Sequence, residues 1–382
     1  MPDSAILLFG DTYTEPNALY KTSFLAPDPV IVVDTGSHVT LWVSRLEYER
    51  ARSEATVDTV RCTADTGAEK LLEKAGSEAG MWPELLLQIA REHGVLSFRV
   101  GATFPALLAD RMRAEGITIH PTAGLYQQQR RIKSSAELEK MTRVENAAMA
   151  AVRKAIEVIA SSTIRDGLLF GANGPLSGDD LTLVVEQSLL EAGCGTAGSI
   201  TCGGPESSNP HARSSPRLRA GLPIVLDIYP FDKQHRYWGD MTRTVVRGKP
   251  TPEAEKMWQA VLDAQMAGLA AVHPGANGRD IHRRCCEVLA QHGFHSPVPP
   301  YSNINSAASF IHGTGHGIGL QVHEFPRIAD VDVELLEGDL ITIEPGLYDP
   351  AVGGVRIEDL VLVTSDGHRN LTPMEKRLVA GA

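Results

Sequence analysis

Four acidic residues and one histidine of this sequence occupy positions where a charged side chain is costly. The acids lie within or at the end of apolar, strand-like runs, and the histidine is embedded in the glycine-rich string Gly315–Gly319; the five are Asp227, Asp240, His316, Glu344 and Glu358. Inward-facing carboxylates repel one another unless a cation neutralises them. An oxygen-rich set with one imidazole suits two divalent ions such as Mn²⁺, Co²⁺, Fe²⁺ or Zn²⁺, which carboxylates bridge at about 3.5–4 Å with a water held between them. The pattern therefore indicates metal-assisted hydrolysis.

Each of these residues also has an ordinary structural explanation. Asp227 could accept backbone hydrogen bonds at a strand end, Asp240 could belong to a turn, and Arg356 could form a structural ion pair with Glu358. We favour a metal site because all five residues occur together in one sequence. The glycines that flank His316 are expected to let the backbone approach a ligand or metal, and Arg356 and Glu358 are expected to share one face of a strand.

Several other catalytic motifs are excluded. His323-Glu324 does not begin a zincin HExxH helix, because Arg327 stands at the second histidine position and Pro326 disfavours a helix. The glycines between positions 313 and 319 do not fit GxGxxG, and neither a GxxxxGK[ST] loop nor a GxSxG elbow occurs. Nucleotide-driven and serine-hydrolase chemistry are therefore not supported.

The elements before the candidate site predict a separate α/β domain over residues 1–131. Short apolar runs alternate there with helical patterns, which is typical of layered strands and helices. The expected strands are Ala5–Phe9, Pro29–Val33, Val39–Val43 and Leu96–Val100. Helices or helix-rich stretches are expected at Ser44–Ala55, Lys70–His93 and Phe104–Glu115, the second interrupted by glycine and proline.

Residues 132–382 predict an α+β domain that carries every candidate site residue. A long amphipathic helix follows the capping-box pair Ser134 and Glu137. Further helices are expected at Asp179–Ala192, from Thr251 to before His273, and at Asp280–His292, and strands at Pro223–Tyr229, Met241–Arg247, Leu340–Glu344 and Gly354–Thr364. Tyr229–Tyr237 is expected to be the hairpin loop between the strands that hold Asp227 and Asp240.

Composition narrows the class of protein. The 382 residues carry 36 Lys+Arg and 47 Asp+Glu, a formal net charge of −11, which argues against a dedicated nucleic-acid binder. No apolar run approaches the roughly 20 residues of a membrane helix, and Met1–Ser4 lacks the positive charge that begins a signal peptide. Five cysteines without CxxC spacing favour reduced thiols in a cytoplasmic enzyme.

The sequence resembles the pita-bread metallopeptidases. It is most similar to their Xaa-Pro branch, which comprises prolidases and Xaa-Pro aminopeptidases. The resemblance rests on the order of six strings between residues 211 and 359: Leu226–Ile228, Gly239–Thr244, Gly315–Gly319, His323–Pro326, Ile343–Gly346 and Val355–Asp359. It implies a C-terminal pita-bread catalytic domain preceded by a creatinase-like N-terminal domain, of which Gly10–Val33 and Arg131–Glu137 are the best-matching pieces. The thirteen-residue interval from Asp227 to Asp240 is longer than in many family members.

The resemblance also implies roles for individual residues. Two divalent ions, with Mn²⁺ preferred over Co²⁺, Fe²⁺ or Zn²⁺, would be bound by Asp227, Asp240, His316, Glu344 and Glu358. Glu344 would serve as general base. The substrate would be contacted by His211, His312, His323 and Arg356, of which His211, His323 and Arg356 would also assist catalysis.

The implied activity is hydrolysis of Xaa-Pro peptide bonds by water held between two metal ions, with short proline-containing peptides as substrates. A cytoplasmic homodimer that binds neither nucleic acid nor membrane is expected. The alternatives are a creatinase-type amidinohydrolase, a methionine aminopeptidase or a non-catalytic module of the same fold. Between the two Xaa-Pro activities, the chain length and the His-Glu-Phe-Pro string favour a dipeptidase-like enzyme, with Xaa-Pro aminopeptidase nearly equal.

Overall fold

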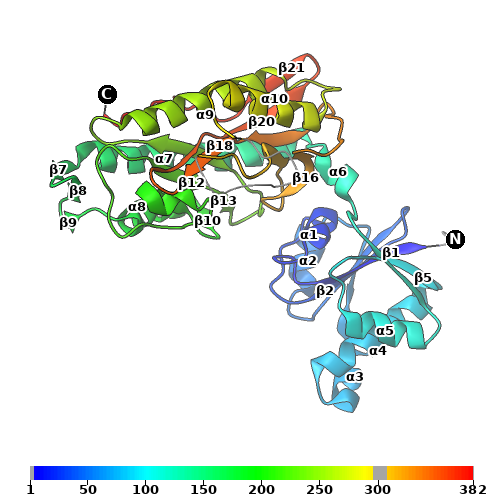
Figure 1. The fold of residues 1–382 in the computed structure, drawn as a ribbon. Coiled ribbons are helices and arrows are strands. Elements are labelled where there is room, and N and C mark those ends of the chain that lie inside the picture. Colours follow the sequence, from blue (N-terminus) through cyan, green and yellow to red (C-terminus); the bar gives the residue numbers. More distant parts are fainter. Residues whose placement is uncertain (1–3, 296–307, 382) are drawn as a thin grey trace. The chain divides into compact units, whose positions relative to one another are not determined.

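The computed structural model describes residues 4–295 and 308–381. The packing of the chain divides it into two units, Met1–Arg130 and Arg131–Ala382, which Figure 1 colours along the sequence. Among the helices of the described residues, none is both long and apolar enough to cross a lipid bilayer.

The N-terminal unit is built on one six-stranded mixed sheet with the strand order β4-β3-β2-β1-β5-β6. Its strands are β1 (Ala5–Gly10), β2 (Val30–Asp34), β3 (Val39–Val43), β4 (Thr59–Cys62), β5 (Ser97–Gly101) and β6 (Thr118–Thr122). Its helices are α1 (Pro16–Thr22), α2 (Tyr48–Glu54), α3 (Ala68–Ala75), α4 (Glu78–His93) and α5 (Ala106–Ala114), with a 3-10 turn at Thr63–Thr66.

Helices cover both faces of this sheet, as an α/β layer structure requires. Along β2, Ile31 and Val33 pack in one apolar cluster with α4 and α5, while Val30 and Val32 pack in another with α1 and α2. The predicted α/β architecture is therefore confirmed. The helix-rich stretch Lys70–His93 is interrupted as expected, because it divides into α3 and α4 at Gly76, whose φ of +69° ends α3.

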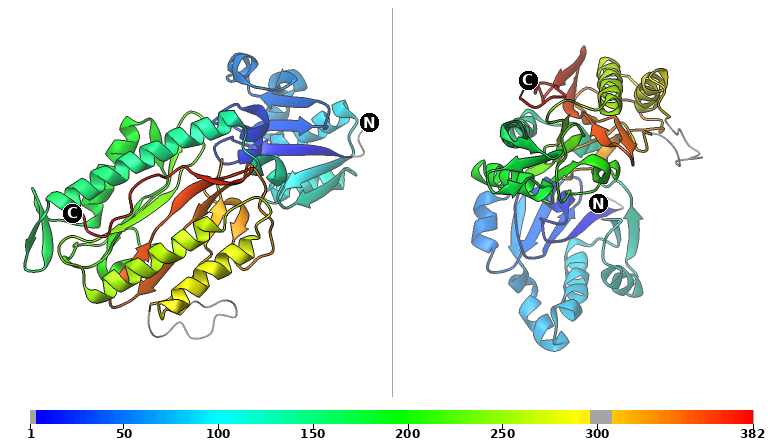
Figure 2. Two further views of the ribbon diagram at one scale, coloured as in Figure 1. Left: turned by 90° about the horizontal axis from the view of Figure 1, so that it is seen from above. Right: turned by 60° about the vertical axis from the view of Figure 1, so that its left-hand side comes forward.

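The C-terminal unit combines several small sheets with four long helices. After α6 (Gln127–Arg131), the helices are α7 (Ser135–Ser161), α8 (Gly178–Glu191), α9 (Pro252–Ala270) and α10 (Gly278–Gln291), with a 3-10 turn at Gly204–Ser208. The capping box of Ser134 and Glu137 at the start of α7 is confirmed. Figure 2 shows α9 and α10 side by side.

Two sheets of this unit carry or adjoin the five candidate metal ligands. One has the order β11-β12-β14 and the other β16-β15-β17-β20-β21; β18 pairs with β19, β10 with β13, and β8 with both β7 and β9. Their strands are β7 (Thr163–Arg165), β8 (Leu168–Gly171), β9 (Gly174–Pro175), β10 (Cys194–Thr196), β11 (Ile200–Gly203), β12 (Ile224–Ile228), β13 (Pro230–Asp232), β14 (Met241–Val245), β15 (Gly315–Gly317), β16 (Glu324–Ile328), β17 (Leu340–Ile343), β18 (Gly346–Asp349), β19 (Gly353–Arg356), β20 (Asp359–Thr364) and β21 (Gly367–Asn370).

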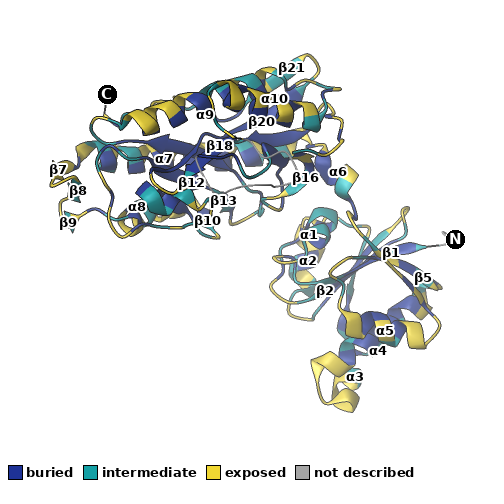
Figure 3. Cartoon of the chain, in the orientation of Figure 1, coloured by how far each residue is buried: buried dark blue, intermediate teal, exposed yellow. Residues whose placement is uncertain are grey.

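The helices lie on the sheet faces opposite the candidate residues. Leu226 and Ile228 of β12 pack against α7 and α8, and Ile343 of β17 packs against α9 and α10. Because side chains alternate along a strand, Asp227 and Glu344 point to the other face. Figure 3 shows these strands as the buried interior of the unit.

Two predictions about local structure are corrected here. The predicted strand Gly354–Thr364 is interrupted between β19 and β20, so Glu358 lies in the break, although Arg356 and Glu358 line the same pocket, as a shared face predicts. The predicted hairpin loop Tyr229–Tyr237 contains β13, which pairs antiparallel with β10. Residues between Asp227 and Asp240 thus form a small two-stranded sheet with β10. Asp232 also accepts hydrogen bonds from the backbone N–H groups of Gln234 and His235.

Candidate active site

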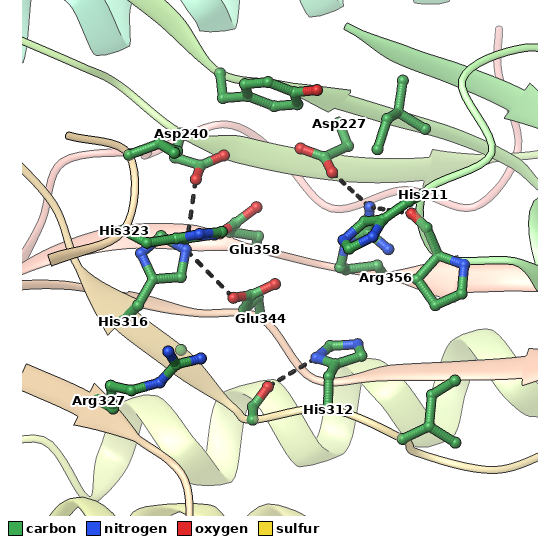
Figure 4. A pocket seen from close by; sticks show the side chains of 17 residues that line it. His211, Asp227, Asp240, His312, His316, His323, Arg327, Glu344, Arg356 and Glu358 are labelled. Atoms are coloured by element: carbon green, nitrogen blue, oxygen red, sulfur yellow. Dashed lines mark hydrogen bonds and ion pairs between the residues drawn. The ribbon is translucent and has the colours of Figure 1, made fainter. Parts of the chain in front are cut away.

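One pocket of the C-terminal unit, with a volume of about 530 Å³, is lined by all nine predicted site residues. Figure 4 shows their side chains converging from strands and loops that are far apart in the sequence. They are His211, Asp227, Asp240, His312, His316, His323, Glu344, Arg356 and Glu358. Two further polar side chains, Tyr229 and Arg327, complete the lining.

The two aspartates face the pocket because of the register of a β-hairpin. β12 and β14 are antiparallel, with Asp227 opposite Thr242 and Ile228 opposite Met241. Asp240 precedes Thr242 by two residues, so Asp227, Asp240 and Thr242 share one face. The strand predicted at Met241–Arg247 is confirmed as β14.

Three side chains approach closely enough to hold one cation. A ligand atom from each of Asp240, His316 and Glu358 lies within 4.8 Å of the others, and all three residues are buried. His316 Nε2 lies 3.6 Å from Asp240 Oδ2 and 3.5 Å from Glu344 Oε1. His316 Nδ1 is 3.0 Å from the carbonyl oxygen of Gly317, to which it can only donate, so the lone pair of Nε2 faces the carboxylates.

The electrostatics of the pocket favour a bound cation. Burial raises the pKa of Glu344 to about 8, and burial together with neighbouring carboxylates raises the pKa values of Asp240 and Glu358 well above their usual range. Burial also lowers the pKa of His316 to about 3, which keeps its imidazole neutral. Within the described residues, Oε1 of Glu358 is buried without a hydrogen-bond partner. These donors fit a divalent metal ion, which would neutralise the carboxylates and satisfy that oxygen.

The fifth predicted ligand, Asp227, is paired with Arg356. Arg356 Nη2 lies 2.5 Å from Asp227 Oδ2, and both side chains are largely buried. Arg356 Nη1 donates to the hydroxyl of Tyr348 at 2.7 Å, and that hydroxyl lies 2.8 Å from His312 Nε2. Because Nδ1 of His312 donates to the Gly313 carbonyl at 2.7 Å, Nε2 accepts from Tyr348. The chain of hydrogen bonds therefore has one direction, from Tyr348 to a neutral His312, whose pKa burial lowers to about 3.

Two histidines reach the pocket from its rim. The His323 ring packs edge-on against the ring of His316, with 4.3 Å between ring centroids. His211 follows the 3-10 turn Gly204–Ser208 and is exposed. Within the described part of the chain, neither imidazole forms a hydrogen bond, so both can interact with a ligand in the pocket.

The glycines around His316 have a packing role in addition to the one expected. A Cβ on Gly315 would lie 1.9 Å from the Thr342 carbonyl oxygen, and one on Gly317 would lie 2.3 Å from that of Phe325. Both glycines therefore permit close packing of β15 against its neighbouring strands, and the backbone of Gly315 also lines the pocket.

Sequence reasoning missed four residues of the site. Arg327, Tyr348 and Thr242 gave no signal of type or spacing, although Thr242 donates to Glu358 Oε2 at 2.8 Å. Glu145 had a signal, because this acid occupies the apolar face of α7 four residues after Met141. It is fully buried, and its Oε2 accepts from the backbone N–H of Asp240 at 3.0 Å.

Comparisons with known proteins agree with this site. The sequence profile described as metallopeptidase family M24 matches residues 136–365. The chain is 29% identical to the Xaa-Pro dipeptidase of Pyrococcus furiosus over 357 residues, covering 91% of this chain and 88% of that protein. The solved structure of the prolidase from Pyrococcus horikoshii superimposes with a TM-score of 0.77 at 27% identity, covering 98% of this chain and 95% of that one.

A second solved structure shares the fold at lower identity. The X-Pro aminopeptidase from Thermotoga maritima superimposes with a TM-score of 0.77 at 21% identity and covers 98% of this chain and 97% of that one. The likeness thus extends over both units of the chain.

Proposed function

The chain belongs to metallopeptidase family M24, and we propose that it is a metal-dependent exopeptidase that hydrolyses Xaa-Pro peptide bonds. The observation that carries this proposal is a single pocket with four buried or largely buried carboxylates, a neutral histidine and two rim histidines. The Xaa-Pro dipeptidase and prolidase relatives, which align over most of this chain, support the same bond specificity. The expected pita-bread fold with an N-terminal domain agrees with these relatives.

The proposed metal ligands are the predicted five, holding two divalent ions, for which Mn²⁺ is the preferred candidate. Asp240, His316 and Glu358 already converge, and Glu344 adjoins His316. Asp227 would complete the set by sharing its carboxylate between Arg356 and an ion. When bound, the ions would polarise the scissile carbonyl and lower the pKa of the attacking water.

The chain's own side chains move protons and bind the developing charge. Glu344 accepts the proton of the attacking water and passes it to the leaving proline nitrogen, because its carboxylate lines the pocket beside the proposed ligand His316. His323 and His211 donate hydrogen bonds to the oxygen that becomes negative in the transition state. Arg356 orients Asp227, and His312 with Tyr348 fixes Arg356.

We further propose that Arg327 binds the free carboxylate of a dipeptide. The guanidinium of Arg356 is buried and bound to Asp227 and Tyr348, so it is poorly placed to bind a substrate carboxylate as well. Arg327 lies opposite His316 in the β15–β16 pair, lines the pocket and has an exposed side chain. An arginine fits a carboxylate through two parallel hydrogen bonds. This favours dipeptides over longer substrates.

The rates of hydrolysis of Leu-Pro and of Leu-Pro-Pro, measured side by side, test this function. We expect Leu-Pro to be the better substrate, and Arg327→Met to lower kcat/KM for Leu-Pro by roughly 10- to 100-fold, as for a lost charge-assisted hydrogen bond. Leu-Pro-amide, which lacks the carboxylate, is the matched control and should be insensitive to the substitution. Faster cleavage of Leu-Pro-Pro than of Leu-Pro would reverse the proposed preference for dipeptides. Equal effects of Arg327→Met on Leu-Pro and on Leu-Pro-amide would contradict binding of the free carboxylate by Arg327.

A further inference from the structure

The segment Arg131–Lys133, just before α7, contributes no side chain to the pocket, yet it is buried at both ends. Arg131 and Lys133 are 5% and 6% exposed, although charged side chains are normally solvated. The backbone of this segment joins that of residues 338 and 339, through an Ile132–Asp339 bridge and a hydrogen bond of 3.2 Å from the Lys133 N–H to the Gly338 carbonyl. Its position beside β17 is therefore fixed.

Lys133 forms an ion pair with Glu324, the residue after His323. Lys133 Nζ lies 3.7 Å from Glu324 Oε2, and the two side chains are 1% and 6% exposed. Lys133 Nζ also lies 3.4 Å from the Arg131 carbonyl oxygen. A buried pair of this kind contributes little net stability, but loss of one partner leaves an uncompensated charge and displaces the other.

Glu324 in turn closes the short turn that carries His323. Its Oε1 accepts a hydrogen bond from the Gln321 backbone N–H at 2.9 Å. A Cβ on Gly319 would lie 2.8 Å from Glu324 Oε2, so the carboxylate packs directly on the backbone where the turn begins. The Glu324 carboxylate therefore lies inside the turn Gly319–Glu324, while the adjacent His323 ring points into the pocket (Figure 4).

Arg131 contacts Phe325, the residue that follows Glu324. Its guanidinium lies 5.0 Å from the centroid of the Phe325 ring. It also binds both carboxylate oxygens of Asp339, at 2.5 and 2.6 Å, just before β17. The segment Arg131–Lys133 thus contacts two consecutive residues that follow His323.

We propose that Lys133 is a positioning residue for His323: its buried ion pair with Glu324 holds the turn that aims the His323 imidazole at the reacting carbonyl. Lys133 is not among the residues that line the pocket. The proposal rests on the role of His323 in the proposed function.

A double-mutant cycle tests whether Lys133 acts through His323. In Leu-Pro hydrolysis, Lys133→Met should lower kcat roughly 10- to 100-fold with little change in KM, the pattern of a lost transition-state contact. In a His323→Ala background the same substitution should have no further effect. Metal content should match wild type in all four proteins. If Lys133→Met and His323→Ala lower kcat by independent factors that multiply in the double variant, Lys133 serves a structural purpose separate from His323 and the proposal is overturned. An unchanged kcat in Lys133→Met would overturn it as well.

Two additional measurements separate this proposal from its alternatives. Lys154→Met, which removes an exposed Lys–Glu pair on α7 with Glu191, is the matched control and should leave kcat unchanged. In Zn²⁺-loaded protein labelled with ¹⁵N-histidine, Lys133→Met should shift or broaden the His323 ring signals, assigned from their loss in His323→Ala, and leave those of His312 in place. This readout needs no turnover, so it distinguishes failure of the positioning role from failure of the proposed activity.

If Lys133→Met does not fold, substitutions of Glu324, its partner in the ion pair, provide the same test. Glu324→Gln removes the carboxylate charge, and Lys133→Met/Glu324→Gln removes both charges and so avoids an unpaired buried ion. Either variant should show the same dependence on His323. Wild-type kcat in both would overturn the proposal.

Discussion

His323 differs from the other histidine near the carboxylates in what its ring can reach. Its imidazole stacks edge-on against His316, but only His316 lies within 4 Å of Asp240 and Glu344 in an ion-pair geometry. Burial and the charge of Arg327 lower the pKa of His323, so the ring is neutral near pH 7 and can donate one N–H to a substrate oxygen.

The first prediction is therefore that His323→Ala separates metal binding from turnover. We expect metal content equal to wild type and a fall in kcat of roughly 10²- to 10³-fold, the cost of one lost donor to a developing oxyanion. Elemental analysis and steady-state kinetics on the same preparation measure both. A variant that has lost its metal would make His323 a ligand and contradict the assignment.

Asp240 should behave in the opposite way. Its carboxylate lies within the group of three converging ligands, so Asp240→Ala is predicted to lose metal and activity together. Asp263→Ala, at a half-exposed carboxylate of α9 paired with His292, provides a control in which both should persist. Full metal content in Asp240→Ala, measured by elemental analysis, would remove this residue from the ligand set.

At the scale of elements, helix α7 supports the metal site from behind the β12–β14 hairpin. Glu145 Oε2 accepts from the Asp240 N–H, and Glu145 Oε1 lies 2.5 Å from the Thr372 hydroxyl, which accepts from the Leu360 N–H at 2.9 Å. One buried side chain thus links the backbone at Asp240 to β20, which begins next to Glu358.

Glu145→Ala is accordingly predicted to weaken metal affinity by about 10- to 100-fold, as for other partners that orient ligands. Isothermal titration of chelator-treated protein with Mn²⁺ measures the change. Glu157→Ala, at an exposed position on the same helix, should bind metal like wild type. Equal affinities in the two variants would show that α7 does not influence the ligands.

The sequence predicted those elements and site residues whose signal is local. The capping box of Ser134, the strands β3, β12 and β17, and the carboxylates within apolar runs all follow from neighbouring residues. The break at Glu358 could not be predicted, because its cause is a contact distant in the sequence: the Glu358 backbone N–H donates to the Thr242 carbonyl at 3.0 Å. Arg327 was missed for the same reason, since only the pairing of β15 with β16 brings it beside His316.

At the scale of the whole molecule, the buried carboxylates make the free energy of unfolding depend both on pH and on bound metal. In metal-free protein, burial raises the pKa values of Glu344 and Glu145 from 4.5 to about 8. Groups with a raised folded-state pKa contribute stability that is fully present below pH 4.5 and is lost as pH rises through about 8. Burial lowers the pKa values of His312 and His316 from 6.5 to about 3, so their contribution is present above pH 6.5 and is lost as pH falls through about 3.

The increase in Tm caused by saturating Mn²⁺ is therefore predicted to be larger at about pH 8 than at about pH 5. At the higher pH more of the Glu344 carboxylate in the metal-free protein is ionised and unneutralised, and protons compete less with metal for the ligands. Thermal unfolding of chelator-treated protein with and without Mn²⁺ at both pH values measures the difference. An equal or smaller increment at the higher pH would contradict this linkage.

The most direct test of the whole account is Leu-Pro hydrolysis by chelator-treated protein as Mn²⁺ is added back. We predict negligible hydrolysis without metal, activity that rises with added Mn²⁺ and saturates at about two ions per chain, and little cleavage of Leu-Ala under the same conditions. Full activity in protein shown by elemental analysis to contain no metal, or equal rates on Leu-Ala and Leu-Pro, would contradict a metal-dependent Xaa-Pro exopeptidase.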